Sequence, residues 1–302
     1  MEPHEVQGQT HCTVAEIPFT KMHGLGNDYI YVDRFSYREE HDWSELSRAI
    51  SERHFGVGSD GLILIEPSSV ADFRMRMFNS DGLEGEMCGN GVRCFAKYVY
   101  EHGLTEKTDL VIETKAGLIR PHLLVRDGKV QSVSVDMGIP RLGRKDIPLS
   151  RLDGPEPAIA EPIQLDGETY YGTPVSMGNP HCVFFVDDVW QVELEKIGPR
   201  LEHHPIFPER ANIEFVAVKS RDAIEMRIWE RGSGITLASG TGSSASVVAS
   251  ILNGKVDRGK PIKVSLPGGV LLVEWREDGH VWQHGPAVEV ASGVFLWERP
   301  RT

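Results

Sequence analysis

Residues 87–103 read Met-Cys-Gly-Asn-Gly-Val-Arg-Cys-Phe-Ala-Lys-Tyr-Val-Tyr-Glu-His-Gly, and residues 238–254 read Ala-Ser-Gly-Thr-Gly-Ser-Ser-Ala-Ser-Val-Val-Ala-Ser-Ile-Leu-Asn-Gly. The glycines of the two stretches align at one constant offset, and at that offset Cys88 falls on Ser239. The repeat predicts two related halves with a cleft between them. Such a cleft can present one group to each face of a small substrate, and here the groups are a thiol and a hydroxyl.

Outward from this repeat, the chain is dominated by short apolar runs rich in β-branched residues and bounded by Gly, Asp, Asn or Pro, which is typical of strands. Helical spacing of apolar residues appears at 43–51, 91–102 and 242–252, and glycines suited to C-terminal caps follow the last two. The sequence therefore predicts an α/β (α+β) fold in which each half has several strands around one central helix.

The length of 302 residues favours about two domains. We expect a disordered N-terminal tail at 1–16, an N-terminal half at 17–135 that carries Cys88, and a C-terminal half at 136–285 that carries Ser239. Residues 286–302 are expected to complete the N-terminal half.

The net charge of −12 argues against nucleic acids and anionic membranes as partners, because both are polyanionic. No apolar run approaches the roughly 20 residues needed to span a bilayer, and residues 1–16 lack the apolar segment of a signal peptide. With four cysteines in a chain of this size, we expect reduced thiols and a cytoplasmic location.

In both copies of the repeat, a Gly-x-Gly turn opens a helix. The first N–H groups of a helix have no internal partners and lie at the positive end of its dipole, which suits a carboxylate. Cys88 precedes such an end, a position that lowers a thiol pKa and favours the thiolate. The alternative is a purely structural pair of strand–helix turns with a small buried cysteine.

Other motifs give no sign of a cofactor or a metal. The stretch 24–29 lacks the third glycine of a dinucleotide fingerprint, and 234–241 lacks the lysine of a P-loop. His203 and His204 have no partner at metal-ligand spacing. Cys94 lies six residues after Cys88 and is interpreted as a core residue. No cofactor and no metal are expected.

The chain resembles the diaminopimelate epimerase family over nearly its whole length after about residue 17. The resemblance is carried by residues 19–28 (Phe-Thr-Lys-Met-His-Gly-Leu-Gly-Asn-Asp), 53–61 (Arg-His-Phe-Gly-Val-Gly-Ser-Asp-Gly), 77–81 (Met-Phe-Asn-Ser-Asp), 88–94 (Cys-Gly-Asn-Gly-Val-Arg-Cys), 176–181 (Ser-Met-Gly-Asn-Pro-His) and 229–232 (Trp-Glu-Arg-Gly).

The resemblance implies a cofactor-independent isomerase that interconverts LL- and meso-diaminopimelate in lysine biosynthesis. Two cysteines act across the α-carbon, one as thiolate base and one as thiol acid. The implied fold has two halves related by a pseudo-two-fold axis, each a curved, mostly antiparallel sheet or barrel around a central helix. The implied partners are a small amino-acid substrate and a second copy of the chain in a homodimer.

The resemblance also assigns residues to roles. Cys88 and the residue at 239 are the catalytic pair. His181 and Glu230 are expected to tune the pKa values of the catalytic groups. The substrate-binding residues carried over by motif are Asn27, Asn79, Gly89, Asn90, Asn179, Asn212, Glu230, Arg231, Gly240 and Thr241.

One position departs from the family pattern, because Ser239 stands where the second catalytic cysteine belongs. A serine hydroxyl is a far weaker acid than a thiol and a poor base unless another group activates it. Three explanations stay open: an engineered substitution, a natural variant with altered chemistry, or a paralogue that only binds its ligand. The functional alternatives are a racemase or isomerase of the same fold acting on another amino acid, and a non-catalytic binding protein.

Overall fold

The computed structural model describes residues 14–298, so residues 1–13 of the predicted disordered tail lie outside the described part. The first three residues of strand β1 (Val14–Gly24) fall inside that predicted tail. Its first residues pair with the last strand of the chain, Val14 opposite Glu298, and Ala15 and Ile17 point into the core. The prediction of a tail up to residue 16 was therefore wrong for 14–16, because a partner distant in sequence orders them.

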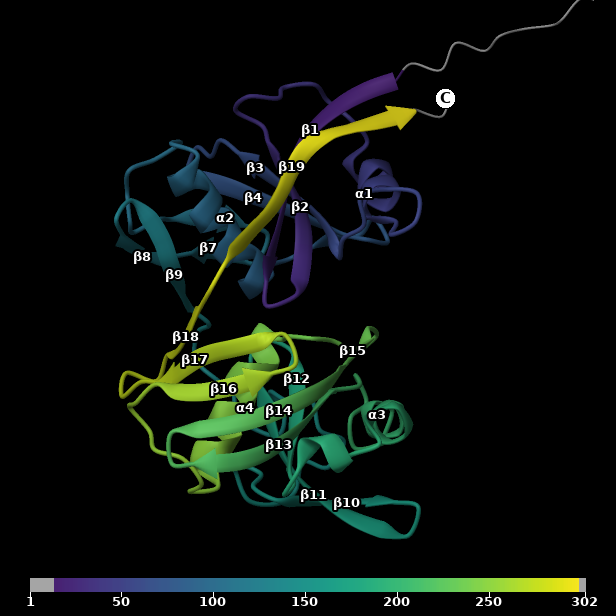
Figure 1. The fold of residues 1–302 in the computed structure, drawn as a ribbon. Helices are drawn as coiled ribbons and strands as arrows, with labels where there is room; N and C mark the ends of the chain where they lie inside the picture. Colours follow the sequence, from purple (N-terminus) through teal and green to yellow (C-terminus); the bar gives the residue numbers. More distant parts are fainter. Residues whose placement is uncertain (1–13, 299–302) are drawn as a thin grey trace, which may run out of the picture.

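The strands form two mixed sheets (Figure 1): the first lies in the upper half, and the second lies in the lower half except for its last two strands, β9 (Lys129–Asp136) and β8 (His122–Arg126), which lie beside helix α2 (Gly89–Glu101) in the upper half. The first, of eight strands, contains β1, β2 (Asn27–Asp33), β3 (Gly61–Glu66), β4 (Phe73–Asn79), β5 (Glu84–Gly85), β6 (Ile112–Thr114), β7 (Gly117–Ile119) and β19 (Val288–Glu298). The second, of eleven strands, contains β8 (His122–Arg126), β9 (Lys129–Asp136), β10 (Glu161–Leu165), β11 (Glu168–Ser176), β12 (Pro180–Phe185), β13 (Asn212–Ser220), β14 (Ala223–Glu230), β15 (Gly234–Ile235), β16 (Ile262–Leu266), β17 (Gly269–Trp275) and β18 (Val281–Gly285).

The two sheets repeat one topology. In the first sheet the order runs β1-β2-β3-β4-β6-β7, and in the second it runs β11-β12-β13-β14-β16-β17. In each series the second and third strands are parallel, the fourth and fifth are parallel, and the other neighbours are antiparallel. Short strands β5 and β15 pair with β4 and β14 at equivalent places. The predicted mixed α+β fold of two related halves is confirmed.

Each half packs its own helix into its core. Helix α2 (Gly89–Glu101) buries Val92, Phe95 and Val99 against the first sheet, and helix α4 (Gly240–Leu252) buries an alanine- and valine-rich surface in the second half. Both helices begin two residues earlier than the apolar spacing predicted. Helix α1 (Trp43–Ser51) has the predicted bounds. No helix in residues 14–298 is long and apolar enough to cross a membrane.

Helix α3 (Leu194–Glu202) was not predicted, and neither was the short 3-10 turn at Val189–Gln191. Gly198 and Pro199 lie inside α3, and both residues lower intrinsic helix propensity. The helix is ordered instead by burial of Leu194 and Leu201 in a core cluster of the second half. Tertiary packing therefore overrides a weak local signal.

The chain crosses between the halves twice. Strand β9, which the sequence places at the end of the N-terminal half, hydrogen-bonds to β18 of the second sheet. Its Val133 and Val135 nevertheless pack in the core cluster that surrounds α2. Strand β19 then returns along β1, and Figure 1 shows it running from the lower half to the upper one. These crossings tie the two halves together beside the ends of α2 and α4.

The β1–β2 turn makes a further contact between the halves. Leu25, at its tip, is 6 % exposed and packs in the core cluster of the second half. A Cβ added at Gly268 would lie 1.9 Å from the Leu25 carbonyl oxygen, and one at Gly26 would lie 2.9 Å from a Leu237 methyl carbon. The backbones of the two halves therefore meet at a point where only glycine fits.

Candidate active site

Two equivalent turns lie at the start of the two central helices; we call residues 88–91 the Cys88 turn and residues 239–242 the Ser239 turn. Cys88 is the N-cap of α2, and its Sγ accepts a hydrogen bond from the Gly91 N–H at 3.4 Å. Ser239 is the N-cap of α4, and its Oγ accepts from the Gly242 N–H at 3.2 Å. The backbone angles match closely, φ −136° and ψ 117° at Cys88 against φ −134° and ψ 124° at Ser239.

The second glycine of each turn is required by packing. A Cβ at Gly91 would lie 2.8 Å from the Ile63 Cδ1, and a Cβ at Gly242 would lie 2.6 Å from the Ile228 Cδ1. Both isoleucines belong to strands beneath the helices, so glycine lets each helix start close to its sheet. The free N–H groups of both helix ends remain available to an anion.

The two turns approach each other around Gln283 and Met137. A Cβ on either Gly89 or Gly240 would lie within 3.7 Å of both the Gln283 side chain and the Met137 side chain. The two halves therefore bring the two turns together, with the thiol on one turn and the hydroxyl on the other.

Asn27 is a polar neighbour of the Cys88 thiol. Its Oδ1 accepts hydrogen bonds from the Cys88 Sγ at 3.3 Å and from the Asn90 Nδ2 at 3.1 Å. Burial raises the pKa of Cys88, and the N–H groups of Gly91 and Asn90 only partly offset that effect. The N–H groups at the helix N-terminus lower the pKa of Cys88, as predicted, but desolvation of the thiolate has the larger effect, so the net shift is upward rather than downward.

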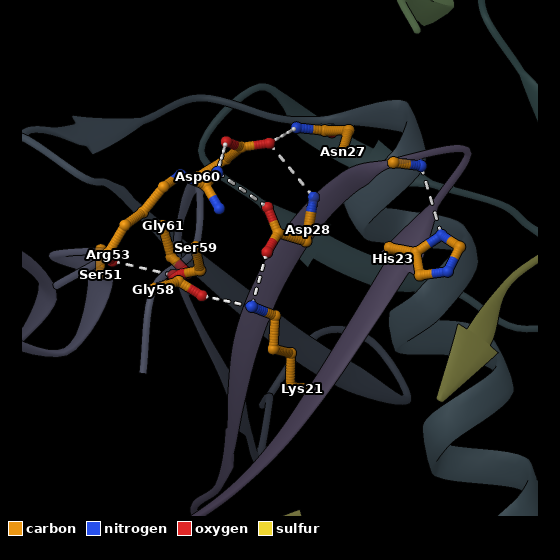
Figure 2. A network of polar contacts seen from close by, with 11 residues as sticks. Lys21, His23, Asn27, Asp28, Ser51, Arg53, Gly58, Ser59, Asp60 and Gly61 are labelled. Carbon is orange, nitrogen blue, oxygen red and sulfur yellow. Dashed lines mark hydrogen bonds and ion pairs between the residues drawn. The ribbon is translucent and has the colours of Figure 1, made fainter. Parts of the chain in front are cut away.

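Asp60 fixes the orientation of Asn27, as Figure 2 shows. Its Oδ2 accepts from the Asn27 Nδ2 at 2.8 Å and from the Asp28 N–H at 3.1 Å, and its Oδ1 pairs with Arg53 at 2.9 Å. Lys21 in turn pairs with Asp28 at 2.9 Å. With the Asn27 amide nitrogen held by a carboxylate, its carbonyl oxygen faces the thiol and stabilises the protonated form.

A second polar cluster lies behind the Ser239 turn. His181 is fully buried, and its Nδ1 lies 2.5 Å from the Glu214 Oε1. The His181 Nε2 lies 2.9 Å from the Asn179 Oδ1, and the Asn179 Nδ2 donates to the Thr241 Oγ1 at 3.5 Å. Burial raises the pKa of Glu214, and among the described residues its Oε2 has no hydrogen-bond partner.

Glu230 is a carboxylate that interacts with Ser239. The Thr236 hydroxyl donates to the Glu230 Oε1 at 2.7 Å. Hydrogen bonds from Thr236 and Ser239 favour the ionised form, but burial has the larger effect and raises the Glu230 pKa. The structure therefore places Glu230, as predicted from sequence, beside the second turn.

Three residues predicted to bind the distal end of the substrate lie at strand ends. Asn212, the first residue of β13, donates to the Pro180 carbonyl at 2.9 Å and accepts from the Arg231 N–H at 2.9 Å. The Arg231 guanidinium donates to the Glu209 carbonyl at 3.0 Å. Asn79 ends β4 opposite Gly61. No hydrogen bond within residues 14–298 joins these three side chains to Cys88 or Ser239.

Three participants were missed from the sequence: Asp60, Glu214 and Gln283. Asp60 lies in the matched stretch 53–61, so it was within reach of the motif comparison. Glu214 interrupts an apolar strand, a position where a carboxylate is fully buried only if it has a partner. Gln283 carries no local signal, because its role depends on strand pairing with distant residues.

A family model described as diaminopimelate epimerase matches residues 19–143 and 173–290, two segments that contain the Cys88 turn and the Ser239 turn. The chain belongs to the diaminopimelate epimerase family. Curated proteins of that name agree. One from Moorella thermoacetica is 51% identical over 278 residues, covering 92% of this chain and 98% of its own. One from Bacillus cereus is 50% identical over 286 residues, which cover 94% of this chain and 99% of the relative.

Solved structures of lower identity share the fold of this diaminopimelate epimerase family member. A Bacillus anthracis phenazine biosynthesis protein of the PhzF family superposes with a TM-score of 0.66 at 19% identity, covering 93% of this chain and 99% of its own. A hydroxyproline epimerase from Agrobacterium vitis gives 0.64 at 14% identity, covering 94% and 92%. At these identities the likeness concerns the fold alone.

Cys88 is expected to be alkylated before Cys94 and Cys182. Cys88 is half-buried, whereas the other two are buried, with a pKa raised to about 12 for Cys94 and raised well above the ordinary value for Cys182. Because the thiolate is the nucleophile and the Cys88 pKa is also raised, labelling should accelerate as pH rises above neutral. Brief iodoacetamide treatment followed by peptide mapping measures the order. Preferential labelling of Cys94 would contradict this assignment of the reactive thiol.

Proposed function

We propose that the chain is an isomerase that interconverts LL- and meso-diaminopimelate in lysine biosynthesis. The observation that carries this proposal is the matched pair of turns, which place Cys88 and Ser239 on equivalent helix ends that meet around Gln283 and Met137. Relatives named diaminopimelate epimerase at about half identity over more than nine-tenths of the chain support this substrate over another amino acid.

In the proposed reaction the substrate α-carboxylate lies between the N-termini of α2 and α4. The N–H groups there, with those of Asn90 and Thr241, stabilise the negative charge that develops when the α-proton leaves. Cys88, as the thiolate, accepts the proton from one face. A proton returns to the opposite face from the side of Ser239, so the configuration inverts and no net proton is consumed.

The distal amino-acid end of diaminopimelate is assigned to the groups at the strand ends. Glu230 can pair with an ammonium, and the planar Arg231 guanidinium can bind a carboxylate through two parallel hydrogen bonds. Asn79, Asn179 and Asn212 are assigned to orienting that end. A substrate with a single amino acid centre would leave these groups without a partner, which favours a substrate with two.

The decisive assay follows LL- and meso-diaminopimelate interconversion by the purified chain without added cofactor, under reducing conditions. We expect turnover by the parent, faster after Ser239→Cys. Absence of turnover in both proteins would overturn the proposal. A panel of other α-amino acids, and proton exchange in deuterium oxide, then separate a racemase of different specificity from a binding protein. The need for a free thiol fits a reducing cytoplasm, where we place the enzyme.

We also propose a homodimer formed through β19. This strand is the edge of the first sheet, and its Val288, Val290, Val294 and Leu296 side chains are between 42% and 62% exposed. A long apolar edge strand is unfavourable when left in water. Sedimentation velocity is expected to show a dimer for the parent and a monomer for Val294→Lys, because the lysine ammonium would be buried without a partner. A monomeric parent would contradict this assembly.

A further inference from the structure

Helix α2 buries a guanidinium that has no carboxylate partner. Arg93 is fully buried, and it forms no ion pair with any carboxylate of residues 14–298. All three of its hydrogen bonds go to neutral oxygens: Nη2 to the Asn90 Oδ1 at 2.7 Å, Nη1 to the Gln283 Oε1 at 2.7 Å, and Nε to the Pro286 carbonyl at 3.2 Å.

A buried charge without a counter-charge is costly, so proteins usually pair it. The other large buried arginine of this chain follows that rule, since Arg144 pairs with the buried Glu161 at 2.5 Å. The backbone around Arg93 is also shaped to hold it. A Cβ at Gly24 would lie 2.9 Å from its Nη2, and a Cβ at Gly285 would lie 3.0 Å from its Nε.

The hydrogen bonds of Arg93 connect the two turns. Asn90, which receives Nη2, belongs to the Cys88 turn. Gln283, which receives Nη1, is fully buried and donates from its Nε2 to the Gly240 carbonyl of the Ser239 turn at 3.1 Å. A continuous series of hydrogen bonds therefore runs from one turn through Arg93 to the other, across the boundary between the halves.

Arg93 also acts on the electrostatics of the thiol. The titratable groups that influence Cys88 or lie behind its hydrogen-bond partner are Tyr29 and Tyr31 of β2, Arg93 and Cys94 of α2, and Asp60 behind Asn27. Burial raises the pKa values of the tyrosines and Cys94, so these groups are neutral near pH 7. The positive charge of Arg93 opposes the effect of burial on Cys88 and favours the thiolate.

We propose that Arg93 is a positioning residue for the reaction: it fixes the two turns relative to each other through Asn90 and Gln283, and its unpaired charge favours an anion between them. The inference rests on the proposed function, in which that anion is first the Cys88 thiolate and then the carboxylate-bearing intermediate. Gln283 contributes to this arrangement because its amide joins Arg93 to the Ser239 turn without neutralising the guanidinium charge.

The test measures two properties of the full chain: the pH dependence of Cys88 alkylation, and kcat and KM for epimerisation. Arg93→Gln is expected to raise the midpoint of the alkylation profile by about one pH unit, as loss of a nearby opposite charge does. It should also lower kcat at least about tenfold, because a rise of one unit in the thiol pKa reduces the thiolate fraction about tenfold near neutral pH. Arg93→Lys keeps the charge, so it should restore most of the midpoint but less of kcat.

Gln283→Glu tests the charge without removing the arginine. The substitution is nearly isosteric, and it gives Arg93 a carboxylate partner. We therefore expect the alkylation midpoint to rise as in Arg93→Gln, while the fold is retained. Arg144→Gln is the matched control, because it removes a buried guanidinium far along the chain from either turn. It should lower the melting temperature and leave the Cys88 midpoint in place.

An unchanged midpoint in Gln283→Glu and Arg93→Gln, with kcat preserved, would overturn the proposal. An equal shift in Arg144→Gln would do the same, because it would show that any buried arginine has this effect. If Arg93→Gln does not fold, Gln283→Glu and Arg93→Lys decide the question. Alkylation needs no turnover, so a chain inactive even after Ser239→Cys would disprove the proposed function while the profile still tests Arg93.

Discussion

Replacing Ser239 with cysteine is expected to raise the epimerisation rate at least about tenfold, equivalent to ~1.4 kcal/mol of transition-state stabilisation. A hydroxyl is a much weaker acid than a thiol, so reprotonation from the Ser239 side limits the parent enzyme. In the reverse direction the hydroxyl must act as a base, where it is poorer still.

The structure indicates that a thiol fits at this position. The Cys88 turn has nearly the same backbone angles and holds a sulfur 3.4 Å from the Gly91 N–H, where the Ser239 Oγ lies 3.2 Å from the Gly242 N–H. The measurement is kcat in both directions for the parent and Ser239→Cys. Equal rates in the two proteins would show that another group, such as His181 or water, delivers the second proton.

Replacing Cys88 with alanine is expected to abolish epimerisation, with a loss of at least about a thousandfold, in the range that a general acid or base contributes. Among residues 14–298 no other thiol can substitute, because Cys94 and Cys182 are buried and have raised pKa values. The measurement is α-proton exchange in deuterium oxide together with kcat in both directions. Cys94→Ala is the control, since it removes a core thiol and should retain exchange.

Residual activity of Cys88→Ala close to that of the parent would show that abstraction does not use this thiol. The pH dependence gives a second check. Because the Cys88 pKa is raised, the fraction of thiolate is small near neutral pH and increases as pH rises. The rate of abstraction by the parent should therefore rise with pH through the neutral range, and this rise should be absent from any residual activity of the variant.

Both central helices and the turns before them could be predicted from sequence, because their signals are local. A Gly-x-Gly turn after Cys88 or Ser239 opens each helix, and apolar residues at helical spacing continue it. The constant offset between the copies then predicted two related halves, as the repeated strand order confirms. Local signals did not predict α3, because Gly198 and Pro199 lower its helix propensity and packing stabilises the helix instead.

The sequence by itself determined the duplicated architecture, the family, and the contrast between a thiol and a hydroxyl at equivalent helix starts. Only the tertiary structure decided the protonation preference of Cys88, since a pKa depends on burial and on partners such as Asn27 that a linear pattern does not place. It also decided which distant residues meet, bringing Gln283 of β18 between the two turns and Arg93 against it. Such long-range contacts arise from strand pairing across the whole chain, and no local sequence signal encodes them.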